Sequence, residues 1–270
     1  MSQLNRLVTC FANLKQLNKT ALVPYIAAGD PSLDMTVPLM HAMVESGANI
    51  LELGVPFSDP MADGPVIQRA TERALKFDTS LTDVFEMVRS FRQQDTNTPI
   101  ILMGYLNPIE VMGYELFITE AVAVGVDGVL TVDLPPEEAQ SFTSLCSTHG
   151  LDPIYLIAPT TSPERMRMIN NFASGFVYYV SIKGVTGAAN IDSQEVSSRV
   201  DSIRKYIELP VGVGFGIKDA ATAVEIAKNA DAVVIGSAII NLIESNLHSP
   251  SKIIQQISEF LSDIRQALDS

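Results

Sequence analysis

The chain has 270 residues, of which 47% are hydrophobic and 18% charged, and its formal net charge at pH 7 is −13. This length and apolar content suffice to bury a large core, and the low charged fraction argues against disorder. The acidic balance, without a run of Lys and Arg, argues against nucleic acid as a partner. It does not exclude an anionic substrate, because backbone N–H groups at a helix N-terminus can hold a phosphate.

The cysteines and histidines give no sign of a disulfide framework or a metal site. Cys10 and Cys146 match neither pattern, and we expect a reduced, cytoplasmic protein without a metal. The histidines lie far apart, without the spacing of metal ligands, at His41, His149 and His248. The most apolar run, 232–243, is interrupted by polar residues and is too short to span a bilayer.

The first 29 residues contain no Asp or Glu, which resembles a transit peptide in charge alone. Apolar residues recur there at helical spacing, and a strand-like run follows at once. They are Leu4, Leu7, Val8, Phe11, Leu14 and Leu17. The spacing predicts an amphipathic helix that closes one end of the domain.

Beyond this helix, apolar strand-like runs alternate with helical patterns. The predicted strands are Ala21–Ala28, Asn49–Val55, Pro99–Tyr105, Gly128–Leu134, Pro153–Ala158, Phe176–Ile182, Val211–Phe215 and Ala232–Gly236. The predicted helices lie near 34–46, 66–75, 81–94, 114–124, 136–149, 162–173, 193–206, 218–228 and 250–268. Helix entries are predicted at Asp30-Pro31, Ser162-Pro163-Glu164 and Ser249-Pro250.

Eight strands, each followed by a helix, match the repeat of a (β/α)8 barrel. A doubly wound open sheet is the alternative α/β fold, but it usually needs fewer strands. Because no Pro-, Gly- or Ser-rich linker divides the chain, we predict a single TIM-barrel domain over residues 1–270, with an extra N-terminal helix. Chemistry in such barrels sits at the C-terminal ends of the strands, so each candidate residue is judged by that position.

The second predicted strand carries an acid, Glu52, in an otherwise apolar run. Strand alternation turns Glu52 away from Leu51 and Leu53, and both faces of a barrel strand are dry. A buried ion pair is the structural alternative, but the predicted strands contain no Lys or Arg. We therefore interpret Glu52 as a functional acid. Burial should raise its pKa, which suits a group that both gives and takes a proton.

The loop after this strand holds two further acids, Asp59 and Asp63, and its backbone is restricted by Pro60 and Pro65. Either acid alone could be a solvated loop residue, and Asp63 could cap the helix that begins near Pro65. Together with Glu52, Asp63 forms a pair of carboxyl groups at one strand end. One is buried and the other better solvated, an arrangement that separates two pKa values and assigns acid and base roles.

Two late strands end in glycine-rich segments, at 213–217 and 235–238. Barrels of this class often bind phosphate with the loops after strands seven and eight and a short helix N-terminus. The alternative is that tight strand-to-helix turns require glycine anyway. Two such segments in the two expected loops favour a phosphate site.

The segment 183–190 is small and polar, which fits either a lid over a substrate or an ordinary surface loop, and Gly187 could add an N–H to the phosphate site. Apolar residues near strand ends could clasp a flat ring, although each could equally be plain barrel packing. They are Tyr25, Met103, Tyr105, Leu130, Val132, Leu156 and Tyr178.

These segments together resemble the alpha subunit of tryptophan synthase. The stretch LELGVPFSDPMADGP at 51–65 is nearly that family's signature. The likeness extends along the chain to PYIAAGDP, MGYLNP, VDLPPEE, KGVTGA, GFGI and IGSAI. Two departures are Tyr25, where the family often has Phe, and the turn 228–231, which lacks the usual Gly.

The resemblance implies a (β/α)8 barrel that cleaves indole-3-glycerol phosphate to indole and glyceraldehyde 3-phosphate. Glu52 would be the acid–base residue, and Asp63 would stabilise positive charge at the indole N–H. The implied phosphate contacts are Gly187, Gly216, Gly236 and Ser237. The implied ring pocket and lid are Tyr25, Tyr105, Leu130, Leu156, Tyr178 and Thr186. No cofactor is implied, because the protonated indole itself accepts the electrons.

The resemblance also implies a partner, a pyridoxal-phosphate-carrying beta subunit in an alpha2-beta2 heterotetramer that joins the released indole to serine. Its docking surface would lie on loops at the strand ends and would include Pro56, Phe57, Asp59, Asn107 and Pro108. Three alternatives stay open from the residues alone. They are a stand-alone indole-producing lyase, a non-catalytic partner subunit, and another phosphate-binding barrel of amino-acid biosynthesis, such as an isomerase or indole-glycerol-phosphate synthase.

Overall fold

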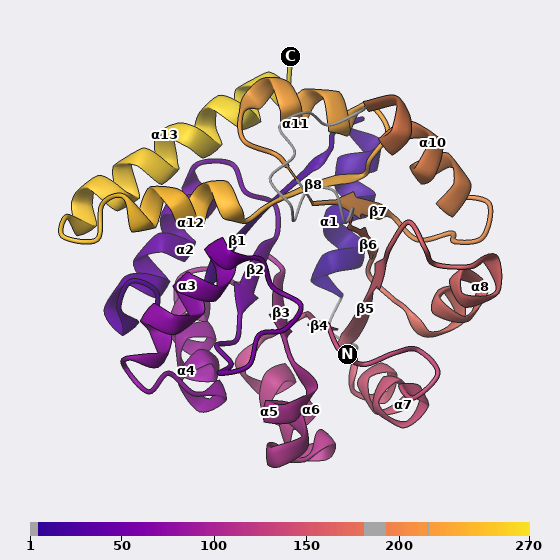
Figure 1. The fold of residues 1–270 in the computed structure, drawn as a ribbon, viewed down its shortest axis with the longest axis horizontal. Helices are drawn as coiled ribbons and strands as arrows, with labels where there is room; N and C mark the ends of the chain where they lie inside the picture. The colour runs from indigo at the N-terminus through magenta and orange to yellow at the C-terminus, as the bar shows by residue number, and fades with distance from the viewer. Residues whose placement is uncertain (1–4, 181–192, 215) are drawn as a thin grey trace.

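The computed structural model describes residues 5–180, 193–214 and 216–270. Eight parallel strands form a closed barrel in the order β1 to β8, with β8 paired to β1, and helices surround the strands (Figure 1). The strands are β1 Ala21–Ala27, β2 Leu51–Gly54, β3 Ile100–Gly104, β4 Gly128–Thr131, β5 Asp152–Ile157, β6 Val177–Tyr179, β7 Val211–Val213 and β8 Ala232–Ile235. The predicted (β/α)8 barrel is confirmed.

Helices follow the strands and cover the outside of the barrel. The early ones are α1 Arg6–Gln16, the 3-10 turn η1 Leu33–Met35, α2 Thr36–Glu45, α3 Pro65–Leu75, α4 Leu81–Arg92, α5 Leu106–Met112 and α6 Tyr114–Val124. The later ones are α7 Gln140–His149, α8 Pro163–Phe172, α10 Ser193–Ile203, α11 Ala220–Ala227, α12 Ser237–Glu244 and α13 Pro250–Leu268.

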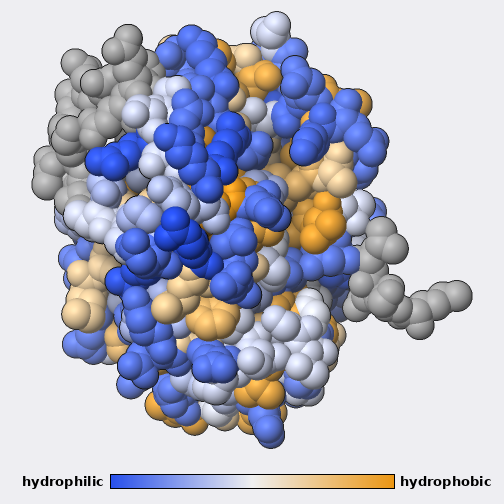
Figure 2. Space-filling model, turned by 90° about the vertical axis from the view of Figure 1, so that its right-hand side faces the viewer, coloured by the Kyte–Doolittle hydropathy of each residue, from blue (hydrophilic) through white to orange (hydrophobic). Residues whose placement is uncertain are grey.

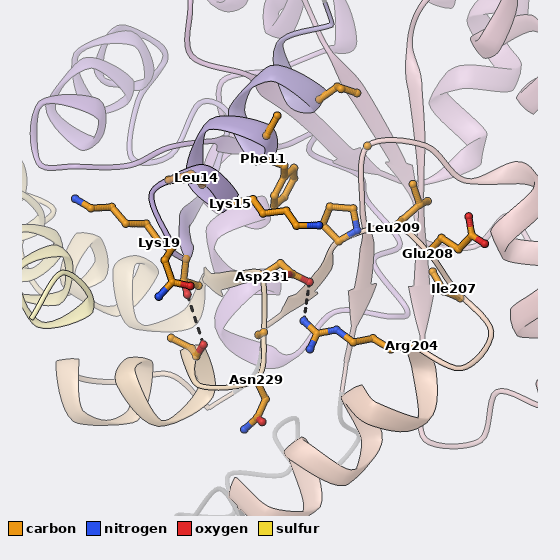
Figure 3. Close-up of a pocket in the computed structure, with 18 of the residues that line it drawn as sticks. Phe11, Leu14, Lys15, Lys19, Arg204, Ile207, Glu208, Leu209, Asn229 and Asp231 are labelled. Atoms are coloured by element: carbon orange, nitrogen blue, oxygen red, sulfur yellow. Dashed lines mark hydrogen bonds and ion pairs between the residues drawn. The ribbon is translucent and has the colours of Figure 1, made fainter.

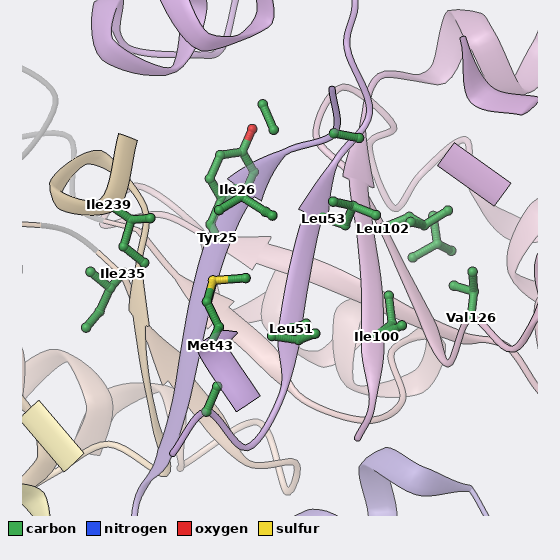
Figure 4. Close-up of a cluster of buried hydrophobic side chains, with 14 of the residues drawn as sticks. Tyr25, Ile26, Met43, Leu51, Leu53, Ile100, Leu102, Val126, Ile235 and Ile239 are labelled. Carbon is green, nitrogen blue, oxygen red and sulfur yellow. The ribbon is translucent and has the colours of Figure 1, made fainter. Parts of the chain in front are cut away.

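Alternating strand residues build two layers of core. The barrel interior is a separate cluster that includes Val23, Ile101 and Leu130. The residues between them in sequence face the helices, where Leu51 and Leu53 of β2 pack with neighbours from β1, β3 and α2 (Figure 4). Each layer is apolar because parallel barrel strands are covered on both faces.

Helix α1 plugs the N-terminal end of the barrel, as predicted. Its buried residues Leu7, Phe11 and Leu14 join the interior cluster. The expectation for Val8 and Leu17 is wrong, since their exposed fractions are 56% and 66%. The apolar stripe is therefore narrower than the sequence suggests, because only one face of the helix meets the barrel.

Polar contacts fix α1 in place. The Arg6 guanidinium donates to Asp127 Oδ1 at 2.8 Å, and Arg92 donates to Asp127 Oδ2 at 2.9 Å. Asn5 caps the helix by accepting from the Val8 N–H at 3.2 Å. A charged bridge thus ties the plug to the start of β4.

Of the three predicted helix entries, those at Ser162-Pro163 and Ser249-Pro250 coincide with helix starts, and the one at Asp30-Pro31 does not. Ser162 accepts a hydrogen bond from the Arg165 N–H at 3.3 Å, so it is a true cap. Ser249 precedes a helix that begins with Pro250, but its side chain makes no cap bond. Asp30 is not a cap. It is fully buried and binds Arg73, and the next helical turn, η1, begins only at Leu33, with Ser32 as its N-cap.

The surface carries no large apolar face in the view of Figure 2, where hydrophobic side chains lie in small separate groups among hydrophilic ones. The large hydrophobic residues that are exposed include Leu33, Met61, Phe77, Val111, Leu116 and Leu247. Within the described ranges, no helix has both the length and the apolar character to cross a membrane.

Candidate active site

Glu52 lies inside the barrel. It pairs in register with Tyr25 of β1 and Ile101 of β3, and Ile101 belongs to the interior cluster. Its exposed fraction is 2%, and among the described residues its Oε1 has no hydrogen-bond partner. Burial, and secondarily the charge of Asp63, raise the pKa of Glu52 to about 8. The expected buried acid is therefore present, and no cation of the described chain forms an ion pair with it.

Asp63 lies on the loop that follows the same strand and is half-buried. The Tyr105 hydroxyl donates to its Oδ2 at 3.1 Å and accepts from the Ala62 N–H at 2.9 Å. Burial raises the pKa of Asp63, and the Tyr105 hydrogen bond opposes that rise. The cap interpretation is wrong, because the N-cap of α3 is Gly64, without a side-chain cap bond.

The loop is held by aromatic packing and a side-chain amide. The ring of Phe57 lies against that of Tyr105, with centroids 5.1 Å apart. Gln68 of α3 donates from Nε2 to the Asp63 carbonyl at 2.8 Å. Sequence reasoning missed Gln68, and its place five residues after Asp63, one turn into the next helix, is the signal that could have found it.

Two tyrosines lie against glycines of neighbouring strand ends. A Cβ added at Gly54 would be 2.2 Å from the Tyr25 hydroxyl, and one added at Gly214 would be 2.1 Å from the Tyr178 hydroxyl. Burial raises both tyrosine pKa values, and the charge of Glu52 contributes to each. Both phenols therefore stay neutral beside the acid.

The other predicted ring-pocket residues lie on the same inner surface. Leu130 is fully buried in the interior cluster, and Leu156 is half-buried against it. Met103 and Val132 pack there as well. These side chains supply an apolar wall beside Glu52.

Three of the predicted phosphate contacts, Gly216, Gly236 and Ser237, lie among the described residues. Gly236 directly follows β8 and is the N-cap of α12, whose first residue is the exposed Ser237. Gly216 has a left-handed φ of 64°, a backbone conformation that favours glycine. Gly187 and Thr186 lie outside the described residues. The free N–H groups of an α-helix N-terminus are suited to an anion.

The predicted docking residues lie at the same end of the barrel. Asp59 and Asn107 are exposed, Phe57 and Pro108 half-buried, and Pro56 buried. The segment that holds Asn107 and Pro108 is not a loop but the start of α5. Asp133, just after the neighbouring strand β4, satisfies a free donor of the first helical turn, since its Oδ1 accepts from the Leu106 N–H at 2.7 Å.

A cavity lies at the opposite end of the barrel, and neither Glu52 nor Asp63 lines it. It is a groove of about 1110 Å³ lined by α1 and by the turns before β1, β6, β7 and β8, and it includes Lys15, Lys19, Arg204 and Asp231 (Figure 3). Arg204 and Asp231 pair across it at 2.9 Å. In the described part of the chain, no three His, Cys, Asp or Glu side chains converge to hold a metal ion.

Fold and site together define a (β/α)8-barrel enzyme with two carboxyl groups at the C-terminal ends of its strands. The sequence matches the tryptophan synthase alpha chain family over residues 11–269. It is 57% identical to the tryptophan synthase alpha chain of Nitrosococcus oceani, over 99% of this chain and 98% of that one. It is 55% identical to that of Herminiimonas arsenicoxydans, over 98% of this chain and all of that one.

Solved structures of tryptophan synthase alpha subunits have the same fold as this chain. Tryptophan synthase subunit alpha from Legionella pneumophila superposes with a TM-score of 0.93 at 48% identity, over 99% of both chains. A chain of Mycobacterium tuberculosis tryptophan synthase gives a TM-score of 0.90 at 34% identity, over 99% of this chain and all of that one. The chain belongs to the tryptophan synthase alpha chain family.

Proposed function

We propose that this chain cleaves indole-3-glycerol phosphate to indole and glyceraldehyde 3-phosphate, with Glu52 and Asp63 as its catalytic residues. One observation carries the proposal. The Glu52 carboxyl is buried in the barrel interior and forms no ion pair with any described residue, and its pKa is raised to about 8. A group with such a pKa can donate and accept a proton near neutral pH.

The reaction is a retro-aldol cleavage in which the protons and electrons balance. The neutral Glu52 carboxyl protonates the indole carbon that bears the side chain, which leaves positive charge on the ring nitrogen. The bond to the glycerol carbon then breaks, and its electron pair returns to the ring. The adjacent hydroxyl becomes the aldehyde and returns its proton to the Glu52 carboxylate, so the enzyme is restored.

Asp63 accepts a hydrogen bond from the indole N–H and stabilises the positive charge that develops there. Its orientation is supported by the Tyr105 hydroxyl, which donates to one of its oxygens at 3.1 Å. The chain needs no cofactor for these steps, because the protonated ring accepts the electrons. Tyr25, Tyr105, Leu130, Leu156 and Tyr178 surround the ring. The lid role of Thr186, which lies outside the described residues, rests on the family resemblance.

The substrate phosphate binds the N-terminus of α12 through the backbone at Gly236 and Ser237. An anion is favoured there by the free N–H groups and the helix dipole. Gly216 supplies a further backbone contact, and the role of Gly187, which lies outside the described residues, rests on the family resemblance. The described residues assigned to this site contribute backbone groups and no basic side chain, which is compatible with the strongly acidic chain.

We also propose that the chain docks on a tryptophan synthase beta subunit in an alpha2-beta2 heterotetramer and passes indole to it. Pyridoxal phosphate belongs to the beta subunit. Pro56, Phe57, Asp59, Asn107 and Pro108 form the docking surface beside the exit. The complex is cytoplasmic, in keeping with two free cysteines that are at least partly buried.

Indole release from indole-3-glycerol phosphate, measured with and without a beta subunit, tests these proposals. Glu52→Gln and Asp63→Asn should each lower turnover by roughly 10²-fold or more while the fold survives. Near-normal indole release by either folded variant would overturn its role. High activity without any beta subunit, and no rise with it, would identify a stand-alone lyase. No release by the wild type even with a beta subunit would contradict the proposed reaction and favour the non-catalytic or isomerase alternatives.

A further inference from the structure

Helix α3 lies between the two halves of the proposed site. It begins at Pro65, two residues after Asp63, and packs against β1 and α12. A Cβ placed at Gly236, at the start of α12, would lie 3.7 Å from Ile67 Cδ1 of α3. One rigid helix therefore contacts both the loop of the second acid and the end of β8 where the phosphate is proposed to bind.

Arg73 anchors α3 to the end of β1. Its Nε and a terminal nitrogen bind the two carboxylate oxygens of Asp30 at 2.7 and 2.9 Å. Asp30 is fully buried and the Arg73 side chain is nearly so, with exposed fractions of 0% and 12%. Bidentate pairs of this kind fix geometry as well as charge, and this one is shielded from solvent.

Arg69 anchors α3 to α12. Its Nε and a terminal nitrogen bind the two oxygens of Glu244 at 2.7 and 2.9 Å. Glu244 is the last residue of α12, whose first residue is Ser237. Arg73 also approaches Glu244, at 3.7 Å, so the two arginines share one carboxylate.

Gln68 joins this framework to the acid loop. Its Nε2 donates to the Asp63 carbonyl at 2.8 Å and to the Pro60 carbonyl at 3.4 Å. Its own N–H donates to the Gly64 carbonyl at 3.0 Å as part of the first helical turn. The backbone on both sides of Asp63 is thus held by a side chain whose helix is itself fixed at two further points.

We propose that Gln68, Arg69, Arg73, Asp30 and Glu244 form a brace, the α3 brace, that positions Asp63 relative to the phosphate-binding end of α12. Gln68 and Arg73 are then positioning residues for the cleavage and do not touch the substrate. The inference rests on the proposed roles of Asp63 and α12. The brace acts because a displacement of about 1 Å at a catalytic group can cost as much as 10²-fold in rate.

The decisive test is a double-mutant cycle of Gln68→Met and Asp63→Asn, read as kcat and KM for indole release. Gln68→Met keeps length and removes the two amide hydrogen bonds. We expect kcat to fall about tenfold or more, with KM changed less than about twofold, because Asp63 acts as charge develops. In the Asp63→Asn background the same change should lower kcat by less than about twofold, since the residue that it positions has already lost its function.

The outcomes separate the brace from the function on which it rests. If Asp63→Asn leaves kcat normal, the proposed role of Asp63 fails first. If Asp63→Asn strongly lowers kcat, the brace is wrong in two cases. Either Gln68→Met leaves kcat unchanged, or it lowers kcat by the same factor in both backgrounds. If kcat falls only as far as the melting temperature does, in both backgrounds, Gln68 has a merely structural role, and the brace is again wrong.

Glu244→Gln provides a second test, with Asp231→Asn as its matched control. Each variant neutralises the acid of an arginine pair of similar exposure, and Asp231 lies at the opposite end of the barrel. Glu244→Gln should lower kcat about threefold or more, and Asp231→Asn should leave it within about 1.5-fold. Equal effects of the two variants on kcat would contradict the brace, even if Gln68→Met failed to fold.

Discussion

Glu52 and Asp63 reach raised pKa values in different surroundings. Among the described residues, burial and the charge of Asp63 act on Glu52 and both raise its pKa, whereas Asp63 accepts a hydrogen bond from Tyr105 that favours its ionised form. At neutral pH this leaves Glu52 as the proton donor and makes Asp63 the better candidate for the anion. The two acids are therefore suited to different steps of one reaction.

The pKa of Glu52 predicts a pH-dependent stability difference. Its folded value of about 8 lies above the ordinary value of 4.5, so the folded state binds more protons between these two values. The free energy of unfolding should therefore fall as the pH rises through this window and level off above it. Glu52→Gln removes this titration. The free energy of unfolding of the variant, minus that of the wild type, should therefore rise by on the order of a few kcal/mol between about pH 5 and about pH 9.

Urea unfolding of both proteins at several pH values measures this difference. The other buried acids titrate in both proteins, so their contributions largely cancel in the comparison. A stability difference that is the same at both ends of the pH range would show that Glu52 titrates normally.

Gly54 and Tyr25 should behave as a pair. A methyl group at Gly54 would meet the Tyr25 hydroxyl at 2.2 Å and two ring carbons at 2.7 and 2.8 Å. Gly54→Ala must therefore displace the Tyr25 ring from its position in the pocket. This should lower the free energy of unfolding by about 1–3 kcal/mol and raise KM. Adding Tyr25→Leu should restore the melting temperature, whereas Tyr25→Phe should not, since the close ring carbons remain. Full restoration by Tyr25→Phe would indicate that only the hydroxyl conflicts.

At the scale of elements, α12 presents its N-terminus to the proposed phosphate site, and α3, which follows the Asp63 loop, packs against α12. Gly236 has a φ of −113°, which any residue can adopt, and a Cβ there would make only ordinary contacts, the nearest at 3.4 Å from Tyr25. Gly216, with its φ of 64°, would be strained by any substitution. Gly236 is therefore the better position at which to test phosphate binding without disturbing the fold.

Gly236→Val should raise KM for indole-3-glycerol phosphate by about tenfold or more, because branched methyl groups obstruct the approach of the anion to the helix N-terminus. Binding of free indole, measured by competition, should change much less. Gly236→Ala serves as the smaller control and should give an intermediate KM. An equal loss for indole and for the phosphate substrate would point to a collapsed pocket and not to a phosphate site.

At the scale of the whole molecule, the barrel separates its two ends. The N-terminal end is closed by α1 and its bridge to Asp127, while the acids, α12 and the exposed loop with Asp59 lie at the other end. A partner that receives indole must dock at the second end. The Asp59 carboxylate is exposed there and accepts a hydrogen bond from the Ser58 hydroxyl at 2.6 Å.

Asp59→Ala should leave basal indole release within about twofold of the wild type and abolish most of the activation by a beta subunit. The reason is that Asp59 faces solvent, so its charge is free to meet a basic partner residue. Steady-state rates with increasing beta subunit measure the effect. Loss of basal activity as complete as that of Asp63→Ala, or activation that is untouched, would contradict this division of labour.

The sequence by itself determined the barrel, its strand order and the burial of Glu52. These features depend on local patterns. Apolar runs of strand length locate the eight strands, and period-two alternation turns Glu52 away from its apolar neighbours. The same reasoning located the plug helix from the spacing of Leu7, Phe11 and Leu14.

The tertiary structure alone decided which distant groups meet. At the start of helix α5, Asp133, 27 residues away, accepts a hydrogen bond from the Leu106 N–H, and no local pattern predicts this contact. Asp30 looked like a helix cap, but Arg73, 43 residues away, binds it in the interior. Tyr105 was expected only to line the ring pocket, but its hydroxyl also donates to Asp63, 42 residues away. Local periodicity records only whether a position is buried, whereas side-chain partners are set by the closure of the barrel, which brings separate strand ends to one rim.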